Sequence, residues 1–364
     1  MISFDPTEEQ QMMRESVAGF ARDELRPVAR AVDEGGTIPA SVAEKVAQLG
    51  LLRTWLPEQY GGDGADRSAV TGAMIVEELA WGDLALAAHL LSPRLFAFPI
   101  LELGTASQRD RFLGHFAGSG FIAASAALTE PRFDFDLASL STRAVAKHGE
   151  WLLDGVKCFV PLAREAEFIL VYAGAGSEVA AFIVPRETPG LEISEREKNM
   201  GLKGLATHEI TLTACRLPAE ARLGSDAASG VVRLTSEMRV ATAAIAAGVA
   251  RAAFEYARDY AKERKAFGAP IATKQAIAFM LAEMAIEVDA MRLLAWEAGW
   301  HLDRGEDAAI ESYLAKQYAA AAALKVTDNA VQVLGGHGYI REHPVELWLR
   351  NARGLAALDA IAIV

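Results

Sequence analysis

The chain has 364 residues, with 36 Lys and Arg against 48 Asp and Glu, and its formal charge of −12 provides no positive field to attract nucleic acid. Hydrophobic residues make up 52% and charged residues 23%, which excludes a disordered chain and predicts two or three folded units at this length. The two cysteines, Cys158 and Cys215, exclude a disulfide framework and lack zinc-site spacing, so we expect no metal and a reducing compartment, the cytoplasm. We find neither a signal peptide nor a stretch of the roughly 20 apolar residues that a membrane span needs, and expect a soluble protein.

Helical patterns occupy the first third of the chain. Thr7 and Gln10 have the spacing of a capping box, and apolar residues then recur at helical spacing. Further helical patterns follow at 41–49 and 68–91, separated by a glycine-rich turn. We therefore predict an N-terminal all-helical domain over residues 1–119.

Short apolar or alternating runs then replace the helical pattern and predict strands. They lie at 121–128, 151–153, 156–160, 168–172, 180–184 and 209–217. Asp154 and Gly155 have the residue types of a two-residue hairpin turn between the second and third runs. We predict a middle β domain, barrel-like or a sandwich, over residues 120–226.

Long helical patterns return at 231–265, 274–304 and 308–334, and a shorter one follows from Pro344. Such lengths are typical of a four-helix bundle, which we predict over residues 227–364. The expected fold class is α+β multidomain, with helices first, strands next and long helices last.

Four short segments carry the chemistry. Each has a simple structural reading when taken alone: a strand end, a turn, a helix C-cap and a glycine-rich helix connection. The segments are Ala127-Leu128-Thr129-Glu130-Pro131, Gly155-Val156-Lys157-Cys158-Phe159-Val160-Pro161, Arg264-Lys265-Ala266-Phe267-Gly268 with Ile271 and Gln275 following, and Gln332-Val333-Leu334-Gly335-Gly336-His337-Gly338-Tyr339. In this order, at these separations and on these element types, they resemble the acyl-CoA dehydrogenase family.

The resemblance implies a bound FAD and a homotetramer built as a dimer of dimers. Residues of the first two segments would lie beside the flavin ring, and Arg264 and Phe267 of the third would reach the flavin of a neighbouring subunit, with Arg264 at its pyrophosphate. The glycines would let the backbone approach the adenosine half of the cofactor. The implied cofactor-binding residues are Leu128, Thr129, Phe159, Pro161, Arg264, Phe267, Ile271, Gln275, Gln332, Gly335 and Gly336.

The resemblance also implies a carboxylate that removes the α-proton of an acyl-CoA while a hydride passes to flavin N5, giving the 2-enoyl-CoA. The family's glutamate position holds Asp359, one methylene shorter, whose alternative reading is a solvated acid near the chain end. Some members place the base on the first bundle helix instead, but that position holds Met238, and Glu237 is rotated away by about 100°. The implied substrate-side residues are Ser236, Arg239 and Leu358.

Three departures from the family pattern are evident. The loop after Pro131 carries Arg132-Phe133-Asp134-Phe135-Asp136 in place of glycine and serine, which adds bulk and negative charge near an expected phosphate. Pro161 and Leu162 replace a threonine and an asparagine. Members of the family continue past the base into a further helix, so the sequence is either naturally short or clipped at Val364.

Two functions from different classes remain open. The first is an acyl-CoA dehydrogenase that passes electrons to electron-transfer flavoprotein or a similar acceptor, and whose short base suits a bulky or cyclic acyl group. The second is a noncatalytic subunit of a hetero-oligomer that lends Arg264 and Phe267 to a partner's flavin. A nucleic-acid-binding relative is disfavoured by the acidic balance and the lack of a basic tail.

Overall fold

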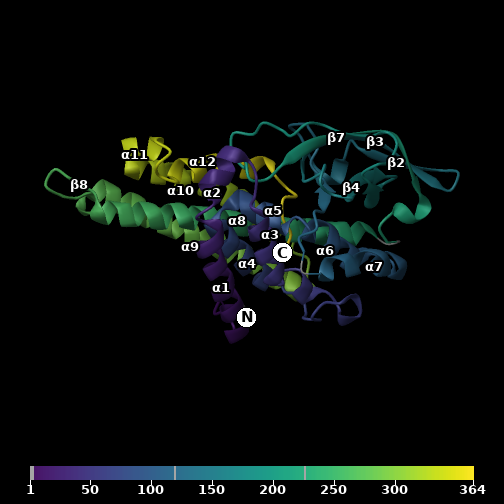
Figure 1. Cartoon of the computed structure of the whole chain (residues 1–364), viewed down its shortest axis with the longest axis horizontal. Helices are drawn as coiled ribbons and strands as arrows, with labels where there is room; N and C mark the ends of the chain where they lie inside the picture. The colour runs from purple at the N-terminus through teal and green to yellow at the C-terminus, as the bar shows by residue number, and fades with distance from the viewer. Residues whose placement is uncertain (1–3, 119, 225–226) are drawn as a thin grey trace.

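The structure, a computed structural model, describes residues 4–118, 120–224 and 227–364. Its elements follow the predicted order of helices, strands and long helices (Figure 1). The capping box at Thr7 and Gln10 is confirmed, with both of its hydrogen bonds formed. The first helices are α1 (Glu8–Phe20), α2 (Ala29–Gly35), α3 (Ala40–Gln48), α4 (Ala69–Gly82), α5 (Leu84–Leu91), α6 (Arg94–Leu103) and α7 (Ala106–Phe112).

The single helix expected over 68–91 is broken at Asp83. This residue has extended backbone angles, φ −162° and ψ 132°, so it ends α4 and starts α5. Its carboxylate accepts a hydrogen bond of 2.9 Å from the backbone N–H of Leu86, as a helix N-cap does. Asp83 therefore separates two helices where the sequence predicted one.

The middle strands form a seven-stranded sheet, with spatial order β1-β4-β2-β3-β7-β6 and β5 paired to β4. β1 and β4 run parallel, whereas β2, β3 and β7 are successive antiparallel partners. The strands are β1 (Ser125–Ala127), β2 (Arg143–Lys147), β3 (Glu150–Pro161), β4 (Phe168–Ala175), β5 (Glu178–Pro185), β6 (Leu191–Ile193) and β7 (Thr207–Pro218).

The hairpin turn predicted at Asp154 and Gly155 is wrong. β2 and β3 are joined by His148 and Gly149, which both have positive φ, 53° and 82°, as a tight two-residue turn requires. β3 continues through Gly155 as a bulge, where its register against β7 shifts. A Cβ on Gly155 would lie only 2.6 Å from the Cα of Thr142. The Asp-Gly pair therefore marks a close approach of two strands.

The last third is a helical bundle. Helices α8 (Ala227–Glu263), α9 (Gln275–Asp303), α10 (Ala309–Leu334) and α12 (Val345–Arg353) pack together, and the short α11 (Gly336–Tyr339) links the last two. The helix predicted to reach Lys265 ends at Glu263. Beyond it, β8 (Lys265–Ala266) and β9 (Ala269–Pro270) form a small hairpin that stands at the far end of the bundle from the large sheet (Figure 1).

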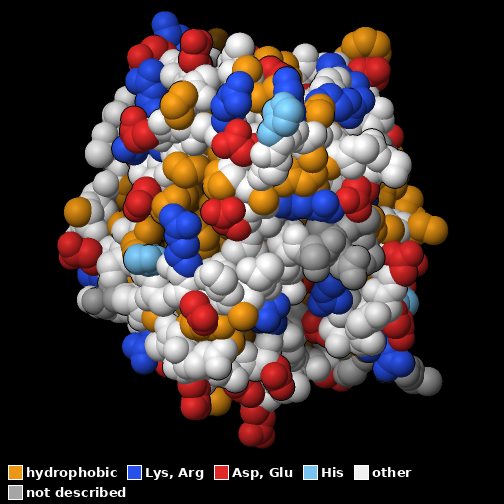
Figure 2. All heavy atoms as spheres, turned by 90° about the vertical axis from the view of Figure 1, so that its right-hand side faces the viewer, with side chains coloured by type: hydrophobic (Ala, Val, Ile, Leu, Met, Phe, Trp, Pro, Cys, Tyr) orange, Lys and Arg blue, Asp and Glu red, His pale blue; other side chains and the backbone are white. Residues whose placement is uncertain are grey.

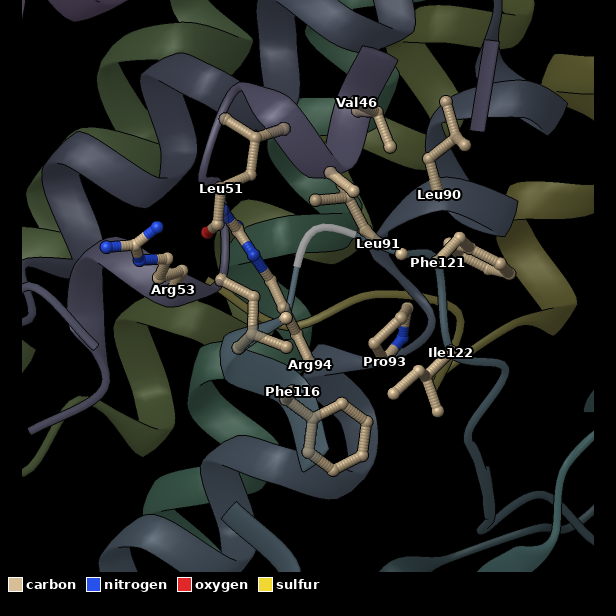
Figure 3. Close-up of a pocket in the computed structure, with 14 residues that line it drawn as sticks. Val46, Leu51, Arg53, Leu90, Leu91, Pro93, Arg94, Phe116, Phe121 and Ile122 are labelled. Atoms are coloured by element: carbon tan, nitrogen blue, oxygen red, sulfur yellow. The ribbon is translucent and has the colours of Figure 1, made fainter. Parts of the chain in front are cut away.

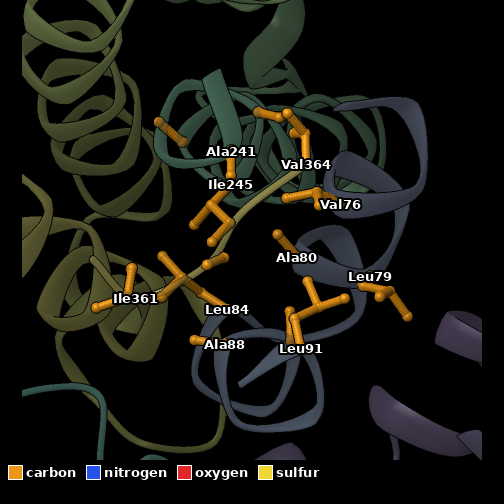
Figure 4. Packing of buried hydrophobic residues seen from close by; sticks show 14 of the residues in the cluster. Val76, Leu79, Ala80, Leu84, Ala88, Leu91, Ala241, Ile245, Ile361 and Val364 are labelled. Atoms are coloured by element: carbon orange, nitrogen blue, oxygen red, sulfur yellow. The ribbon is translucent and has the colours of Figure 1, made fainter. Parts of the chain in front are cut away.

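The main hydrophobic core joins the first helices to the bundle. Ile361 and Val364, from the segment that follows Asp359, lie among side chains of α4, α5 and α8, including Val76, Leu91 and Ile245 (Figure 4). The segment fits closely: a Cβ on Gly72 of α4 would lie 2.9 Å from the Val364 Cβ. The residues after Asp359 are therefore held in the core by packing.

Among the described residues, no single helix is both long and apolar enough to cross a membrane. The bent pair α5 and α6 passes that test by length and composition only, and most of its side chains are buried in the protein core. The face at the sheet end mixes cationic, anionic and apolar side chains without a continuous positive area (Figure 2).

Candidate active site

The first predicted segment forms the end of β1 and the turn after it. Leu128 and Thr129 are buried, and the Thr129 carbonyl accepts a 3.0 Å hydrogen bond from the N–H of Cys158 on β3. No other described residue hydrogen-bonds to the Thr129 hydroxyl, which leaves this donor available to a ligand. The two segments that were expected to contact one flavin ring are thus adjacent.

An ion pair that sequence reasoning did not single out holds these segments together. Lys157 is completely buried, and its Nζ lies 3.0 Å from Glu130 Oε1 and 2.9 Å from the Leu128 carbonyl. The Glu130 carboxylate also accepts backbone N–H groups of Ser141 and Thr142 at 2.6 and 2.8 Å. The one signal in the sequence was a lysine at an otherwise apolar strand position.

The two partners titrate in a way that preserves the pair at neutral pH. Burial opposes ionisation of Glu130, but the charge of Lys157 and the two backbone donors outweigh it and lower its pKa to about 2. Burial lowers the pKa of Lys157 to about 8, against the opposing effect of Glu130. Both groups therefore remain charged near pH 7.

The second segment contains a bulge at Phe159. Its φ is 53°, and the register of β3 against β7 shifts between Lys157 and Val160. Phe159 lines a cavity of about 190 Å³, which Leu358 also lines. The structure thus brings together one predicted flavin contact and one predicted substrate contact. Pro161 is buried beside them and pairs in register with Thr207, another lining residue.

Asp359 follows the short helix η8 (Gly354–Ala357) and directly adjoins Leu358 of this cavity. Its side chain is only 20% exposed, and its Oδ1 lies 2.7 Å from Nζ of Lys316, a buried residue of α10. The carboxylate is therefore not a solvated acid on a loose chain end. Lys316 is a second residue that sequence reasoning missed, because only the fold brings α10 against the segment after η8.

The two predicted substrate residues on α8 lie elsewhere in the helix packing. Ser236 is buried, and its hydroxyl donates to the carbonyl of Val232 one turn earlier at 3.2 Å. Arg239 is half-buried, forms no ion pair with a described residue, and places its guanidinium carbon 5.3 Å from the ring centre of Tyr313. Neither residue lines the cavity of Phe159.

Glu237, the acid beside the alternative base position, is engaged structurally. It is buried and lies 2.7 Å from Arg67 and 3.2 Å from Arg233. Burial raises its pKa to about 7, against the opposing charge of Arg67. With both cations paired to it, Glu237 belongs to an ion-pair network that joins Arg67, in the segment before α4, to Glu102 of α6 and to α8.

The third and fourth segments meet at the far end of the bundle. Arg264, Ile271, Gly335 and Gly336 line one cavity of about 280 Å³. The Arg264 side chain is exposed and forms no ion pair with any described residue. A Cβ on either glycine would meet no atom within 4 Å, so the backbone there is open to an approaching group.

The remaining members of these segments are exposed around that cavity. Phe267 is 96% exposed and, with Gly268, forms the positive-φ turn of the β8–β9 hairpin. The helix C-cap reading of this segment does not describe Gly268, whose positive φ of 81° lies in this turn and not at a helix end. Gln275 begins α9 and Gln332 lies in the last turn of α10, both exposed.

The two groups of predicted residues lie at opposite ends of the chain's long axis. The 37-residue helix α8 runs between the sheet region and the β8–β9 hairpin, and a helix of that length spans roughly 55 Å (Figure 1). One chain therefore does not bring both groups to the same small molecule. If they serve one ligand, a second chain must supply one of them.

The loop that departs from the family pattern does not fill the cavity near Phe159. Phe133 is fully exposed, and Phe135 is half-buried against the main core. Arg132 donates a 2.9 Å hydrogen bond to the hydroxyl of Ser141, which ties the loop back to the turn around Glu130. Neither phenylalanine is among the residues that line the cavity.

Comparison with known proteins adds three family matches. The chain matches the models described as acyl-CoA dehydrogenase, N-terminal domain over residues 7–119, middle domain over 125–215 and C-terminal domain over 231–359.

Individual relatives agree with these matches. The chain is 37% identical over 363 residues to "Probable acyl-CoA dehydrogenase YngJ" of Bacillus subtilis, covering 97% of this chain and 94% of the relative. It is 35% identical to a cyclohex-1-ene-1-carbonyl-CoA dehydrogenase of Geobacter metallireducens, covering 95% and 93%. Its fold matches butyryl-CoA dehydrogenase from Megasphaera elsdenii with a TM-score of 0.89 and 30% identity over 99% and 96% of the two chains.

Proposed function

The chain belongs to the acyl-CoA dehydrogenase family of flavin-dependent oxidoreductases, and from this premise we propose that it oxidises an acyl-CoA thioester to the 2-enoyl-CoA with Asp359 as the base. One observation carries the proposal. Phe159 and Leu358 line one cavity, and Asp359, which follows Leu358 directly but is not itself a lining residue, is the acidic residue next to it in the chain. A base must lie within reach of the proton that it removes.

The residues present fit FAD, the cofactor of the family. The open backbone at Gly335 and Gly336 beside the unpaired cation of Arg264 suits a diphosphate, because a guanidinium pairs well with phosphate oxygens and the glycines present no side chain. The buried turn at Thr129 offers an unpaired hydroxyl and a rigid backbone to the ring. When bound, FAD would supply the hydride acceptor.

Asp359 would accept the α-proton on its carboxylate. Lys316 donates its hydrogen bond to Oδ1, so Oδ2 would be the oxygen that takes the proton. Burial of the residues that follow Asp359 limits how far the carboxylate can move toward a substrate, and a misplacement of 1 Å costs about a hundredfold in rate. The aspartate is one methylene shorter than the glutamate usual in the family, so the substrate must come closer to it.

This shorter reach favours a bulky or cyclic acyl group over a straight chain. A relative named for a cyclic substrate, cyclohex-1-ene-1-carbonyl-CoA, matches 95% of this chain. We infer that a ring bound in the Phe159 cavity brings its α-carbon closer to Asp359 than a straight chain does. Faster oxidation of hexanoyl-CoA than of cyclohexanecarbonyl-CoA would contradict this inference.

Flavin absorbance tests the proposed function. The purified chain should carry bound flavin, and an acyl-CoA added without oxygen should bleach it. Asp359→Asn should retain the flavin and bleach roughly 10²–10⁴-fold more slowly, since that is the usual contribution of a general base. Asp289→Asn, which removes an exposed aspartate of α9, is the matched control. Equal bleaching rates in Asp359→Asn and the unaltered chain would exclude Asp359 as base.

The exposed cavity at the bundle end supports a second part of the proposal: a homotetramer in which this end completes the flavin site of a neighbouring subunit. We further propose that electron-transfer flavoprotein or a similar acceptor reoxidises the flavin. Sedimentation of the purified chain tests the assembly, and a persistent flavin-free monomer would oppose it.

The alternative is a noncatalytic subunit that completes a partner's flavin site. The free cation of Arg264 and the exposed Phe267 favour it, because both would serve a partner chain whether or not Asp359 is active. A colourless purified chain that gains flavin only with a second, different chain would support this alternative over the enzyme.

A further inference from the structure

Two tyrosine–histidine pairs stand side by side near the cavity of Arg264. The hydroxyl oxygen of Tyr260 lies 2.6 Å from Nδ1 of His337. The hydroxyl oxygen of Tyr256 lies 2.8 Å from Nδ1 of His343. The tyrosines are one helical turn apart on α8, and the two imidazole rings stack with 5.3 Å between their centres and 21° between their planes. The two pairs therefore share one geometry, and each joins α8 to the segment from α11 to α12.

Of these two pairs, one lines the cavity of Arg264. Tyr260 and His337 are among its lining residues, whereas Tyr256 and His343 are not. Tyr260 also precedes Arg264 by one helical turn, and its carbonyl accepts a 2.8 Å hydrogen bond from the backbone N–H of Arg264. The exposed cation and the Tyr260–His337 pair therefore border the same space of about 280 Å³.

The second ring nitrogen of His337 is available to a ligand. Tyr260 occupies Nδ1, and no described residue forms a hydrogen bond with Nε2. His337 is half-buried, but its Nε2 is not enclosed by the protein. The contact with Tyr260 at one edge and the stack on His343 at one face hold the ring in place. Nε2 is thus an accessible polar atom on a ring whose orientation the chain fixes.

The cavity of Arg94 among the first helices differs in this respect (Figure 3). Arg94 extends through a space of only about 50 Å³, which mainly aliphatic and aromatic side chains line. Its Nη2 donates a 2.6 Å hydrogen bond to the carbonyl of Leu51, and Nε and Nη1, which have no partner, are enclosed by the protein. Arg94 therefore presents no free donor to a ligand, whereas Arg264 and His337 keep polar atoms accessible.

The hydroxyl of Tyr260 determines which ring nitrogen of His337 carries hydrogen. A phenol donates a hydrogen bond more readily than its oxygen accepts one, so we expect Tyr260 to donate to Nδ1. A neutral imidazole whose Nδ1 accepts must carry its hydrogen on Nε2. His337 then offers an N–H donor at the cavity, beside the cation of Arg264, and such a donor suits a phosphate oxygen.

We propose that His337 is a further cofactor-binding residue whose Nε2–H donates to the diphosphate of FAD, and that Tyr260 is the residue that positions its ring. This inference rests on the proposed placement of the FAD diphosphate beside Arg264 and the glycines. Arg264 supplies charge on a mobile, exposed side chain, and Gly335 and Gly336 leave room for the phosphates. His337 adds a donor at a fixed position, which the exposed arginine does not provide.

The second tyrosine–histidine pair supplies the matched control for a fluorescence titration of the flavin-free chain with FAD. Tyr260→Phe removes only the hydroxyl that holds His337 and should weaken FAD binding roughly three- to tenfold. His337→Phe keeps a ring for stacking but removes both nitrogens, and should weaken FAD binding roughly tenfold or more, as expected for a hydrogen bond to a charged group. Tyr256→Phe and His343→Phe make the same changes outside the cavity and should alter FAD affinity less than about twofold.

A purely structural role of the two pairs predicts a different result. If the pairs only tie α11 to α8, Tyr260→Phe and Tyr256→Phe should lose FAD affinity equally, and so should the two histidine variants. Equal losses would overturn the proposal. Melting temperatures without FAD identify any variant that fails to fold, and Tyr260→Phe, the mildest change, keeps the test decisive if His337→Phe is unstable.

Two amide substitutions separate the ring nitrogens of His337. The side-chain amide of Gln reaches the position of Nε2, whereas that of Asn reaches only the position of Nδ1. His337→Gln should therefore retain more of the FAD affinity than His337→Asn. The reverse order would leave His337 only its contact with Tyr260 and would exclude the contact with the diphosphate.

Arg264→Ala distinguishes failure of this inference from failure of the proposed function. If Arg264→Ala and His337→Phe both bound FAD as tightly as the unaltered chain, the cofactor would not lie at this end of the bundle, and the proposed placement would fail together with the inference. If Arg264→Ala weakened FAD binding and His337→Phe did not, only the role of His337 would fail. The titration needs no turnover, so neither the identity of the base nor that of the acyl group affects it.

Discussion

The two halves of the candidate flavin site differ in how the chain stabilises them. The turn at Thr129 is buried, hydrogen-bonded to β3 and fastened by the ion pair of Glu130 and Lys157. The cavity of Arg264 and Gly335 is exposed, and its cation has no partner among the described residues. The first half is organised by the chain alone, whereas the second keeps its binding groups free for a molecule outside the chain.

This difference predicts that a change in the first half affects folding, and one in the second half affects binding. The largest effect should come from Lys157→Met. The substitution leaves the buried carboxylate of Glu130 without its cation, and breaking a buried pair typically costs about 3–5 kcal/mol. We expect a fall of this size in the free energy of unfolding by urea denaturation, together with loss of flavin.

The exposed lysine of α8, Lys262, provides the control for that experiment. Lys262→Met removes the same charge at the surface and should change the free energy of unfolding by less than about 0.5 kcal/mol. If Lys157→Met and Lys262→Met had the same free energy of unfolding, Lys157 would not stabilise the turn at Thr129.

Acid should weaken the first half through the same pair. The pKa of Glu130 is lowered to about 2 in the folded chain, below its ordinary value of 4.5, so its contribution is complete above pH 4.5 and is lost as the pH falls toward 2. The loss should be on the order of 3 kcal/mol at most. Between pH 5 and pH 2, the free energy of unfolding should therefore fall further in the unaltered chain than in Glu130→Gln. For each protein, the fall is measured from its own value at pH 5.

Arg264→Ala probes the second half. Because the side chain is exposed and unpaired, the free energy of unfolding without flavin should change by less than about 0.5 kcal/mol. Flavin affinity should fall roughly 10–100-fold, as expected for a charge-assisted contact worth about 1.5–3 kcal/mol. Fluorescence titration of FAD measures it, with Arg258→Ala as the control, because Arg258 lies on the same helix but pairs with Asp259. Equal affinity in both variants would remove Arg264 from the site.

Periodicity and local motifs predicted much of this arrangement. The capping box at Thr7 and the long helical patterns correspond to observed helices, and the glycines of the last segment meet Arg264 in one cavity. The hairpin at Asp154 was wrong because a local Asp-Gly pair serves a turn and a bulge equally well, and only the pairing partner of each residue separates the two.

The contacts between distant elements could not be predicted in this way. The partner of Asp359 is Lys316, 43 positions earlier on a different helix, and nothing in either local pattern indicates the other. The same holds for Arg94, whose neighbours Leu51 and Trp55 come from an irregular segment. These residues have their contacts only through tertiary packing, and helical or strand periodicity carries no information about which distant elements meet.

The smallest effect should come from the glycine turn, where two neighbouring glycines separate backbone strain from ligand contact. Gly335 has φ 58° and ψ −129°, a conformation that is costly for any residue with a Cβ, whereas Gly336 begins the helix α11 without positive φ. A Cβ meets no atom within 4 Å at either position, so steric contacts do not distinguish them. Gly335→Ala should therefore lower the free energy of unfolding by about 1–2 kcal/mol, and Gly336→Ala should leave it unchanged or slightly higher.

Both added methyl groups enter the space expected for the cofactor, so both variants should bind FAD more weakly in the titration used for Arg264. If Gly336→Ala bound FAD as tightly as the unaltered chain, the cofactor would not approach this turn, and the second half of the site would reduce to Arg264 and the hairpin.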